Sequence, residues 1–199
     1  MDKILLFNRW DLSEVKVNDP GLRRYININP VIVPKSSGKL NRPSIHKADM
    51  SVVERFINKL RVPGHRGKKH KLSSGHVTGS YINVYLAVKE GFEIIHRKTK
   101  KNPVQVLVEA IENSALLEEV MGYRLGGIIA RKSVVTTPQR RLDIALRLIA
   151  QDIFSSSFRK KKKFPEIMAD ELIAIASGDQ RNSVIQERNR IEREAEGAR

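Results

Sequence analysis

The chain has 199 residues, and its 37 lysines and arginines outnumber its 22 aspartates and glutamates, which gives a formal net charge of +15. This length suits one domain, and an apolar fraction of 40% is enough for one hydrophobic core. Because so large a cationic excess repels itself unless a polyanion neutralises it, we expect nucleic acid as the partner, with an anionic membrane surface as the second choice.

Several classes of protein are excluded by what the sequence lacks. Without cysteine there is no disulfide framework and no cysteine-bound zinc or iron–sulfur site. The apolar run at residues 4–7 is too short for a signal peptide, and no run approaches the roughly 20 apolar residues that span a membrane. We therefore expect a soluble, cytoplasmic protein.

The first 45 residues are expected to form an irregular N-terminal arm that is at best partly packed on the core. Prolines recur there from Pro20 to Pro43, at a spacing too close for long helices. Residues 14–17 could form a short strand, and residues 21–28 one or two helical turns. A flexible basic linker is expected at residues 34–39.

Beyond this arm the pattern becomes helical. A first helix is predicted from Ser51, a suitable capping residue, to Leu60, because apolar residues recur there at helical spacing. A basic, glycine-containing loop over residues 63–79 separates it from a second helix over residues 80–98. Gly91 lies inside that second helix, where glycine costs about 1 kcal/mol relative to alanine.

The middle of the chain predicts a helix followed by a hairpin. Asn102 followed by Pro103 is a typical helix start, and the stretch after it carries the strongest apolar stripe in the sequence. Two strand-like runs, residues 118–125 and 128–136, then flank the pair Gly126 and Gly127. Glycines tolerate the positive φ angles of a primed hairpin turn.

Three more helices complete the chain. One begins at Thr137, with Pro138 in its first position, and runs to about residue 155. Another opens at Pro165 and stops at Gly178. The highly charged residues that follow suit an exposed helix with a frayed end.

The predicted fold class is therefore all-α, with a single bundle of about six helices and one protruding two-stranded β-ribbon. Residues 1–45 form the irregular N-terminal arm, and residues 46–199 form the helical domain with its β-hairpin at residues 118–136.

The helix after Thr137 is the first candidate for nucleic-acid binding. On a helical wheel Arg140, Arg147 and Gln151 cluster within about 40° of one another, away from the apolar stripe, while Arg141 lies about 100° from Arg140. Guanidinium groups at this spacing can bind phosphates as bidentate forks. A solvated helix face is an equally good interpretation of this helix taken alone.

The hairpin favours the nucleic-acid interpretation. Arg124 precedes its tip, and Arg131 and Lys132 follow the tip. A two-stranded ribbon with a basic tip could enter a groove or rest on a single strand. Tyr123, beside Arg124, could stack on a base or pack inside the protein.

Three further basic segments are less specific, because flexible basic loops are often merely solvated. They are the loop over residues 63–79, the run over residues 159–163, and the lysines ahead of Asn102, where the helix N-terminus would favour a phosphate. The candidate RNA-binding residues are therefore Arg66, Lys68, Lys69, Lys71, Lys98, Lys100, Lys101, Arg124, Arg131, Lys132, Arg140, Arg141, Arg147, Arg159, Lys160 and Lys161.

The sequence predicts no enzyme, metal site, cofactor or small-molecule substrate. The five histidines form no HExxH pair, and no cysteine could complete a metal site. Residues 64–68 echo a phosphate-binding loop but lack the GxxxxGKS or GxxxxGKT spacing, and neither GxSxG nor GxGxxG occurs.

Residues on both sides of the hairpin follow the pattern of a known family. They are Lys101-Asn102-Pro103-Val104-Gln105-Val106-Leu107, Glu109-Ala110, Glu112-Asn113, Arg124, Gly126-Gly127, Pro138-Gln139-Arg140-Arg141, Ala145 and Ala169-Asp170-Glu171-Leu172. In these residues the chain resembles small-subunit ribosomal protein seven, a family found in all ribosomes. Residues 6–10, 15–19 and 188–193 resemble its archaeal and eukaryotic branch.

The resemblance implies a helical domain with a β-ribbon arm that binds the three-prime major domain of small-subunit ribosomal RNA. Members of this family help to start assembly of the subunit head, and they lie among other head proteins near the exit tRNA site and the messenger path. Gly126 and Gly127 would shape the ribbon tip. The loop over residues 63–79 is longer and more basic than the family suggests, so its contacts do not carry over. The residues whose positions imply rRNA contacts are Arg124, Arg140, Arg141 and Arg147.

Two hypotheses follow. The first is a structural rRNA-binding protein of the cytoplasmic ribosome, which neutralises phosphates and recognises RNA shape. The alternative is a basic DNA-binding regulator or architectural protein, which would place a helix pair or the ribbon in a groove. A membrane-surface protein is not expected, because the apolar stripes have core spacing and lack large exposed aromatic residues.

Overall fold

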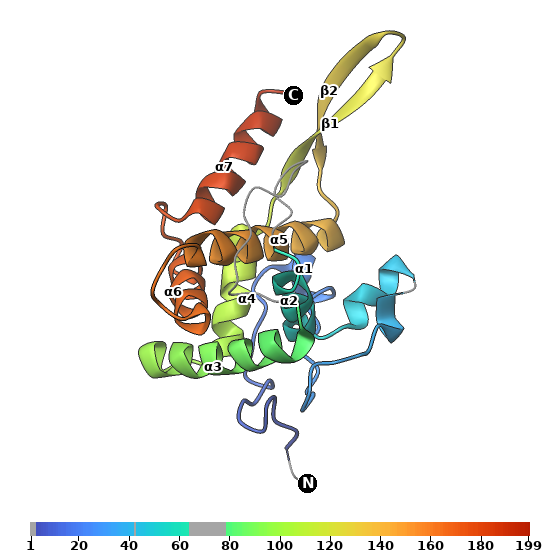
Figure 1. Ribbon diagram of the computed structural model, residues 1–199. Coiled ribbons are helices and arrows are strands. Elements are labelled where there is room, and N and C mark those ends of the chain that lie inside the picture. The colour runs from blue at the N-terminus through green and yellow to red at the C-terminus, as the bar shows by residue number, and fades with distance from the viewer. Residues whose placement is uncertain (1–2, 42, 64–78) are drawn as a thin grey trace.

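The computed structural model describes residues 3–41, 43–63 and 79–199. In this part of the chain, helices pack around one core and a two-stranded antiparallel ribbon projects from them (Figure 1), which confirms the predicted fold class. The α-helices are α1 (Pro20–Arg23), α2 (Val52–Leu60), α3 (Tyr81–Thr99), α4 (Pro103–Ser114), α5 (Pro138–Ser157), α6 (Phe164–Ala176) and α7 (Ser183–Glu196), the strands are β1 (Glu118–Leu125) and β2 (Ile128–Val135), and the 3₁₀-helices are η1 (Lys39–Asn41) and η2 (Ser44–Asp49).

The helices begin close to their predicted starts, but not every predicted cap forms. Asn102 caps α4 as expected, because its side-chain oxygen accepts a hydrogen bond from the Val104 amide at 3.1 Å. Ser51 and Thr137 precede α2 and α5, yet neither side chain makes a capping hydrogen bond. Gly178, at φ 72°, follows the end of α6 as predicted. Buried apolar side chains, and not caps, therefore hold α2 and α5 in place.

Helix α4 lies within the core, and α3, α5 and α6 pack against it. Its stripe of Val104, Leu107 and Ile111 is fully buried. Gly91 of α3 has a packing role, because a β-carbon at this position would lie 1.9 Å from Cε of Met168 on α6. The glycine that weakens α3 as an isolated helix thus lets α3 pass close to α6.

The N-terminal segment is irregular, as predicted, but it packs on the core more fully than the expected arm. The predicted strand at residues 14–17 is wrong. The side chain of Gln105 on α4 accepts a hydrogen bond from the Lys16 amide at 2.8 Å and donates one to the Lys16 carbonyl at 3.3 Å. A side chain thus takes the place of a neighbouring strand. The buried residues of this segment are Leu6, Phe7, Leu12, Val15, Val17, Leu22 and Ile26.

Two carboxylates lie together where α5, α6 and α7 meet. The amide of Asn182 donates to Asp152 at 3.3 Å and to Glu171 at 3.0 Å, and the Ser183 hydroxyl also donates to Asp152. Burial raises the pKa of Glu171, a hydrogen bond from Ser156 opposes this, and the charge of Asp152 raises the pKa again. Glu171 therefore binds its proton more tightly in the folded protein than in the unfolded chain.

We expect Glu171→Gln to raise the thermal unfolding midpoint at pH 7. A carboxyl with a raised folded-state pKa stabilises the fold below its ordinary pKa of 4.5, and this contribution is lost as the pH rises through the folded-state pKa. The neutral amide removes that loss, so the difference between variant and wild type should shrink as the pH falls toward 4.5. Circular dichroism melts across this pH range measure it. The exposed control Glu14→Gln should show no such trend, and an equal trend in both variants would contradict the prediction.

Candidate nucleic-acid interface

The ribbon carries cations on both of its faces. In its register Glu118 lies opposite Val135 and Leu125 opposite Ile128. Because side chains alternate along a strand, Arg124 and Arg131 share one face, and Lys132 lies on the other face with Tyr123. Gly126 has a φ of 61°, as a primed turn requires for its first central residue. Residues 120–135 contain no acidic residue, so the projecting part of the ribbon is purely cationic in its charge.

The acidic residues of the ribbon lie at its base, where the protein itself neutralises them. Arg140 of α5 forms a two-point ion pair with Glu119, with one N–O distance of 2.7 Å. Arg199 donates to Glu118 at 2.7 Å, and Ser133 donates to it at 3.0 Å. The bond from Arg199, followed by that from Ser133, lowers the pKa of Glu118. These contacts tie the base of the ribbon to α5 and to the end of the chain beyond α7.

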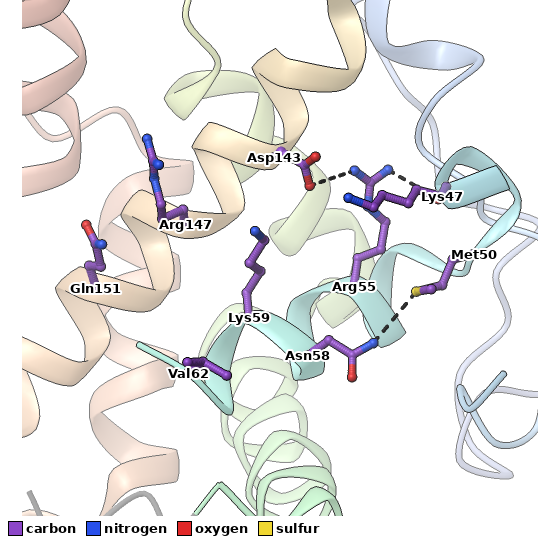
Figure 2. Close-up of a pocket in the computed structure, with 9 residues that line it drawn as sticks. All are labelled: Lys47, Met50, Arg55, Asn58, Lys59, Val62, Asp143, Arg147 and Gln151. Carbon is purple, nitrogen blue, oxygen red and sulfur yellow. Dashed lines mark hydrogen bonds and ion pairs between the residues drawn. The ribbon is translucent and has the colours of Figure 1, made fainter. Parts of the chain in front are cut away.

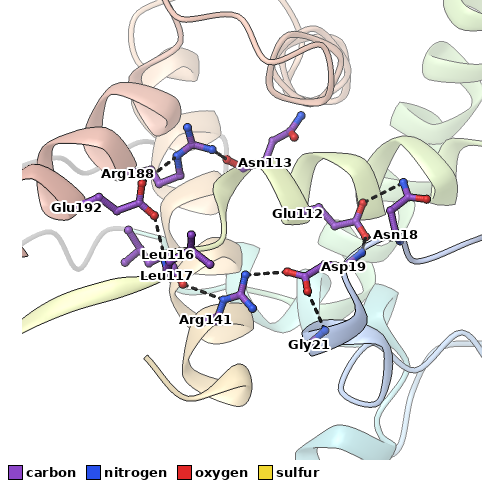
Figure 3. A network of polar contacts seen from close by, with 10 residues as sticks. All are labelled: Asn18, Asp19, Gly21, Glu112, Asn113, Leu116, Leu117, Arg141, Arg188 and Glu192. Carbon is purple, nitrogen blue, oxygen red and sulfur yellow. Dashed lines mark hydrogen bonds and ion pairs between the residues drawn. The ribbon is translucent and has the colours of Figure 1, made fainter. Parts of the chain in front are cut away.

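The arginines predicted on α5 fall into three different environments. Arg140 pairs with the ribbon, as described above. Arg141 is only 11% exposed and donates to the Leu116 carbonyl at 2.8 Å and to Asp19 at 2.7 Å (Figure 3). Arg147 is exposed, and among the described residues it has no carboxylate within ion-pair distance. The candidate RNA-binding arginines of α5 therefore divide into a brace for the ribbon, an internal contact and an exposed cation.

Arg147 lies beside a cleft between α2 and α5 that the sequence analysis did not identify (Figure 2). The cleft has a volume of about 410 Å³. Arg55 and Lys59 of α2 and Lys47 of η2 contribute cations to it, and Arg55 donates to Asp143 at 3.1 Å. The sequence feature that could have indicated this cleft is the i, i+4 spacing of Arg55 and Lys59, which lie on the side of α2 away from its apolar stripe.

The structure brings two predicted basic segments together at another corner. Lys98 of α3 and Lys162 of the run 159–163 both pair with Asp170 on α6, the second at 3.2 Å. Burial alone would raise the pKa of Asp170, but the bonds from the two lysines lower it below its ordinary value. Arg159 lies over the Phe158 ring, with 5.1 Å between its guanidinium carbon and the ring centroid. Of the predicted sites in this corner, those exposed and without an ion-pair partner among the described residues include Lys100, Lys101, Lys160 and Lys161.

Four of the predicted sites, Arg66, Lys68, Lys69 and Lys71, lie outside the described residues. Within the described ranges no group of three or more metal-binding side chains gathers. In the same ranges, no helix combines the length and the apolar character needed to cross a membrane.

Comparison with known proteins gives one consistent result. A family profile described as "Ribosomal protein S7p/S5e" matches residues 22–199. The small ribosomal subunit protein uS7 of Methanospirillum hungatei is 45% identical over 98% of this chain and 95% of its own length. The proteins of that name from Nanoarchaeum equitans and Archaeoglobus fulgidus are 41% and 40% identical, over 99% and 100% of this chain and 100% and 96% of their own lengths. The similarity thus extends over the N-terminal segment, the ribbon and the helices alike.

Substitution of neighbouring arginines on α5 should separate internal from external roles. Arg141→Ala removes the hydrogen bonds to the Leu116 carbonyl and to Oδ2 of Asp19, so we expect it to lower the free energy of unfolding by about 2–3 kcal/mol. Arg147→Ala removes an exposed side chain and should change it by no more than about 0.5 kcal/mol. Urea unfolding followed by circular dichroism measures both values. A loss in Arg141→Ala as small as that expected for Arg147→Ala would mean that the contacts of Arg141 do not stabilise the fold.

Proposed function

The chain belongs to the S7p/S5e family of ribosomal proteins and is of the archaeal type, and on that premise we propose that it binds the three-prime major domain of small-subunit ribosomal RNA. It is a ribosomal protein of the small subunit and not an enzyme. Our proposal goes beyond family membership and names the RNA partner, which is the rRNA domain that forms the subunit head.

The observation that carries this proposal is a set of exposed cations that the protein does not neutralise itself. Arg124, Arg131 and Lys132 lie on the ribbon and Arg147 lies on α5, all exposed and all without a carboxylate within ion-pair distance in the described part of the chain. Double-helical RNA presents phosphates and 2′-hydroxyls at its surface and hides the base edges of its deep, narrow major groove. Such cations suit that surface, because each can displace a counterion from a phosphate.

The ribbon is the part we propose to reach toward exit-site tRNA and the messenger path. It projects from the helices (Figure 1), and its projecting part has no acidic residue to repel a phosphate. Met121 and Ile128 are 52% and 75% exposed beside Tyr123, so the ribbon also offers apolar surface for bases. Its base is braced by α5, which favours a fixed direction of approach.

We further propose a role early in assembly of the head, before neighbouring head proteins bind. The N-terminal segment packs on the helical core, and residues 46–199 with the hairpin would supply the RNA contacts. A folded protein that neutralises phosphates can organise RNA for later partners. On this proposal it acts within ribosomes of the cytoplasm.

Removal of the three ribbon cations should weaken RNA binding and flatten its salt dependence. We expect Arg124→Ala, Arg131→Ala and Lys132→Ala together to lower the slope of log K against log salt by about 2–3, since each phosphate contact contributes roughly 0.7–0.9. Filter binding to a three-prime major domain fragment over a salt series measures the slope.

A matched control removes the same charge from cations that already have partners. Lys3, Arg9 and Arg190 pair with Asp11, Glu93 and Glu187. Alanine at these three positions should leave the slope close to that of the wild type. If the slope decreases by the same amount in both triple variants, the net charge of the protein and not the ribbon determines RNA binding.

Competition between RNA and DNA tests the alternative of a DNA-binding protein. A ribbon can also enter the major groove of DNA, which is wide enough for two strands. With labelled rRNA fragment bound to the protein, unlabelled rRNA fragment and duplex DNA of equal length are compared as competitors at equal salt. We expect the rRNA fragment to compete at a concentration at least about tenfold lower than the DNA, because its shape offers contacts beyond charge. Equal or better competition by duplex DNA would favour the alternative.

A further inference from the structure

The cleft between α2 and α5 differs from the ribbon, because it is concave and its wall mixes cations with apolar and amide groups. Its volume of about 410 Å³ falls in the range of roughly 300–1,000 Å³ that is typical of small-ligand sites. An RNA backbone lying across this face would touch the rim without filling the cleft. Space for a small organic group beside charge for an anion suits a ligand that has both parts.

We propose that this cleft takes a single unpaired nucleotide turned out of the bound RNA, with its phosphate at the cationic rim and its base against the apolar wall. The inference rests on the proposed function, since the nucleotide belongs to that RNA. Proteins that recognise particular RNA sequences do so mainly on unpaired bases, whose edges are accessible.

The phosphate end is defined by an excess of cations. Arg55 donates to Asp143 at 3.1 Å, so these two charges offset each other. Lys47, Lys59 and Arg147 have no carboxylate within ion-pair distance in the described ranges. Burial lowers the pKa of Lys59, and although Asp143 opposes this, the charges of Arg147, Lys47 and Arg55 lower the pKa further. A phosphate bound here would relieve the repulsion.

The base end is defined by one exposed apolar side chain and two amides. Val62, just beyond the end of α2, is 60% exposed and offers the apolar wall, while Met50 is buried on the other side of Asn58 (Figure 2). The Asn58 amide nitrogen donates to the Met50 sulfur at 3.7 Å, while the carbonyl oxygen of Asn58 remains an acceptor. Gln151 lies across the cleft on α5, beside Arg147 (Figure 2). Amides on opposite walls can bind the edge of a base.

Two simpler ligands would contact fewer features of the cleft than a nucleotide would. A free phosphate ion would use the cations but not the apolar wall. An acidic peptide would satisfy the cations with carboxylates, yet its acidic side chains have no flat apolar group to place against Val62. A nucleotide uses both ends at once.

The first test is Lys59→Met, which keeps the aliphatic stem of the side chain and removes its charge. Because burial disfavours the ammonium group, the variant should unfold at the same or a higher temperature than the wild type. Its affinity for the three-prime major domain fragment should fall about tenfold, as expected for a lost contact to a charged group. Arg190→Ala, whose cation already pairs with Glu187, should keep the wild-type affinity. Unchanged affinity in Lys59→Met would overturn the proposal.

The second test identifies the occupant. The full chain with photoreactive benzoylphenylalanine in place of Val62 is irradiated with the RNA fragment, and the crosslinked nucleotide is mapped by reverse transcription. We expect one nucleotide, which chemical probing of the free RNA finds unpaired. RNA with an abasic residue at that position should bind the wild type about tenfold more weakly, and Asn58→Ala should weaken binding to intact RNA but not to abasic RNA.

Crosslinks spread along a duplex, a crosslink to a protein, or full affinity for the abasic RNA would each overturn the nucleotide assignment. None of these results would abolish the salt-dependent binding that the ribbon supplies. If the proposed function itself is wrong, the wild type fails to bind the fragment at all, so the two failures are distinct.

Discussion

Two arginine side chains, Arg141 and Arg188, hold the end of α4 and the turn that leads from it into the ribbon, because they donate hydrogen bonds to backbone carbonyls in both (Figure 3). The last carbonyls of a helix have no partner within that helix, and at a buried end they need one from elsewhere. Arg141 binds the Leu116 carbonyl at 2.8 Å and Arg188 binds the Asn113 carbonyl at 2.6 Å, while Glu192 accepts from the Leu117 amide at 3.0 Å. Since β1 begins directly after this turn, the turn determines the direction in which the ribbon leaves the core.

The same constraint explains how so cationic a chain stays folded. Carboxylates such as Asp19 and Glu119 lie where a cation must be fixed, and they pair with Arg141 and Arg140 in the interior and at the ribbon base. The cations that remain include those on the projecting ribbon, around the α2–α5 cleft and at the corner near Asp170. Separation in space limits their mutual repulsion, which falls with distance and with screening by salt.

Short sequence patterns predicted the helices and strands of this fold well, because a helix start, an apolar stripe or a glycine pair is recognised from residues close together in the chain. It could not assign roles to arginines on one helix. The helical wheel gives the direction of Arg141, but Asp19, which meets it, lies 122 positions away in sequence. The strand expected at residues 14–17 fails for the same reason, since Gln105, 89 positions away from Lys16, satisfies that backbone. Lys59 was overlooked because only the fold places it opposite Arg147.

The ribbon and the cleft suit two different parts of RNA recognition. Long exposed cations on both ribbon faces can meet phosphates of almost any arrangement, so on the proposed function they would supply affinity and a fast approach but little information about sequence. The cleft accepts one group of limited size and places amides against it, so it can set the register of the RNA on the protein. Its half-buried Lys59 is unfavourable for the free protein, as expected where binding and stability oppose each other. The brace of the ribbon on α5 joins the two sites, because Arg140 and Arg147 lie on one rigid helix. A nucleotide held at the cleft would therefore also fix where the ribbon reaches.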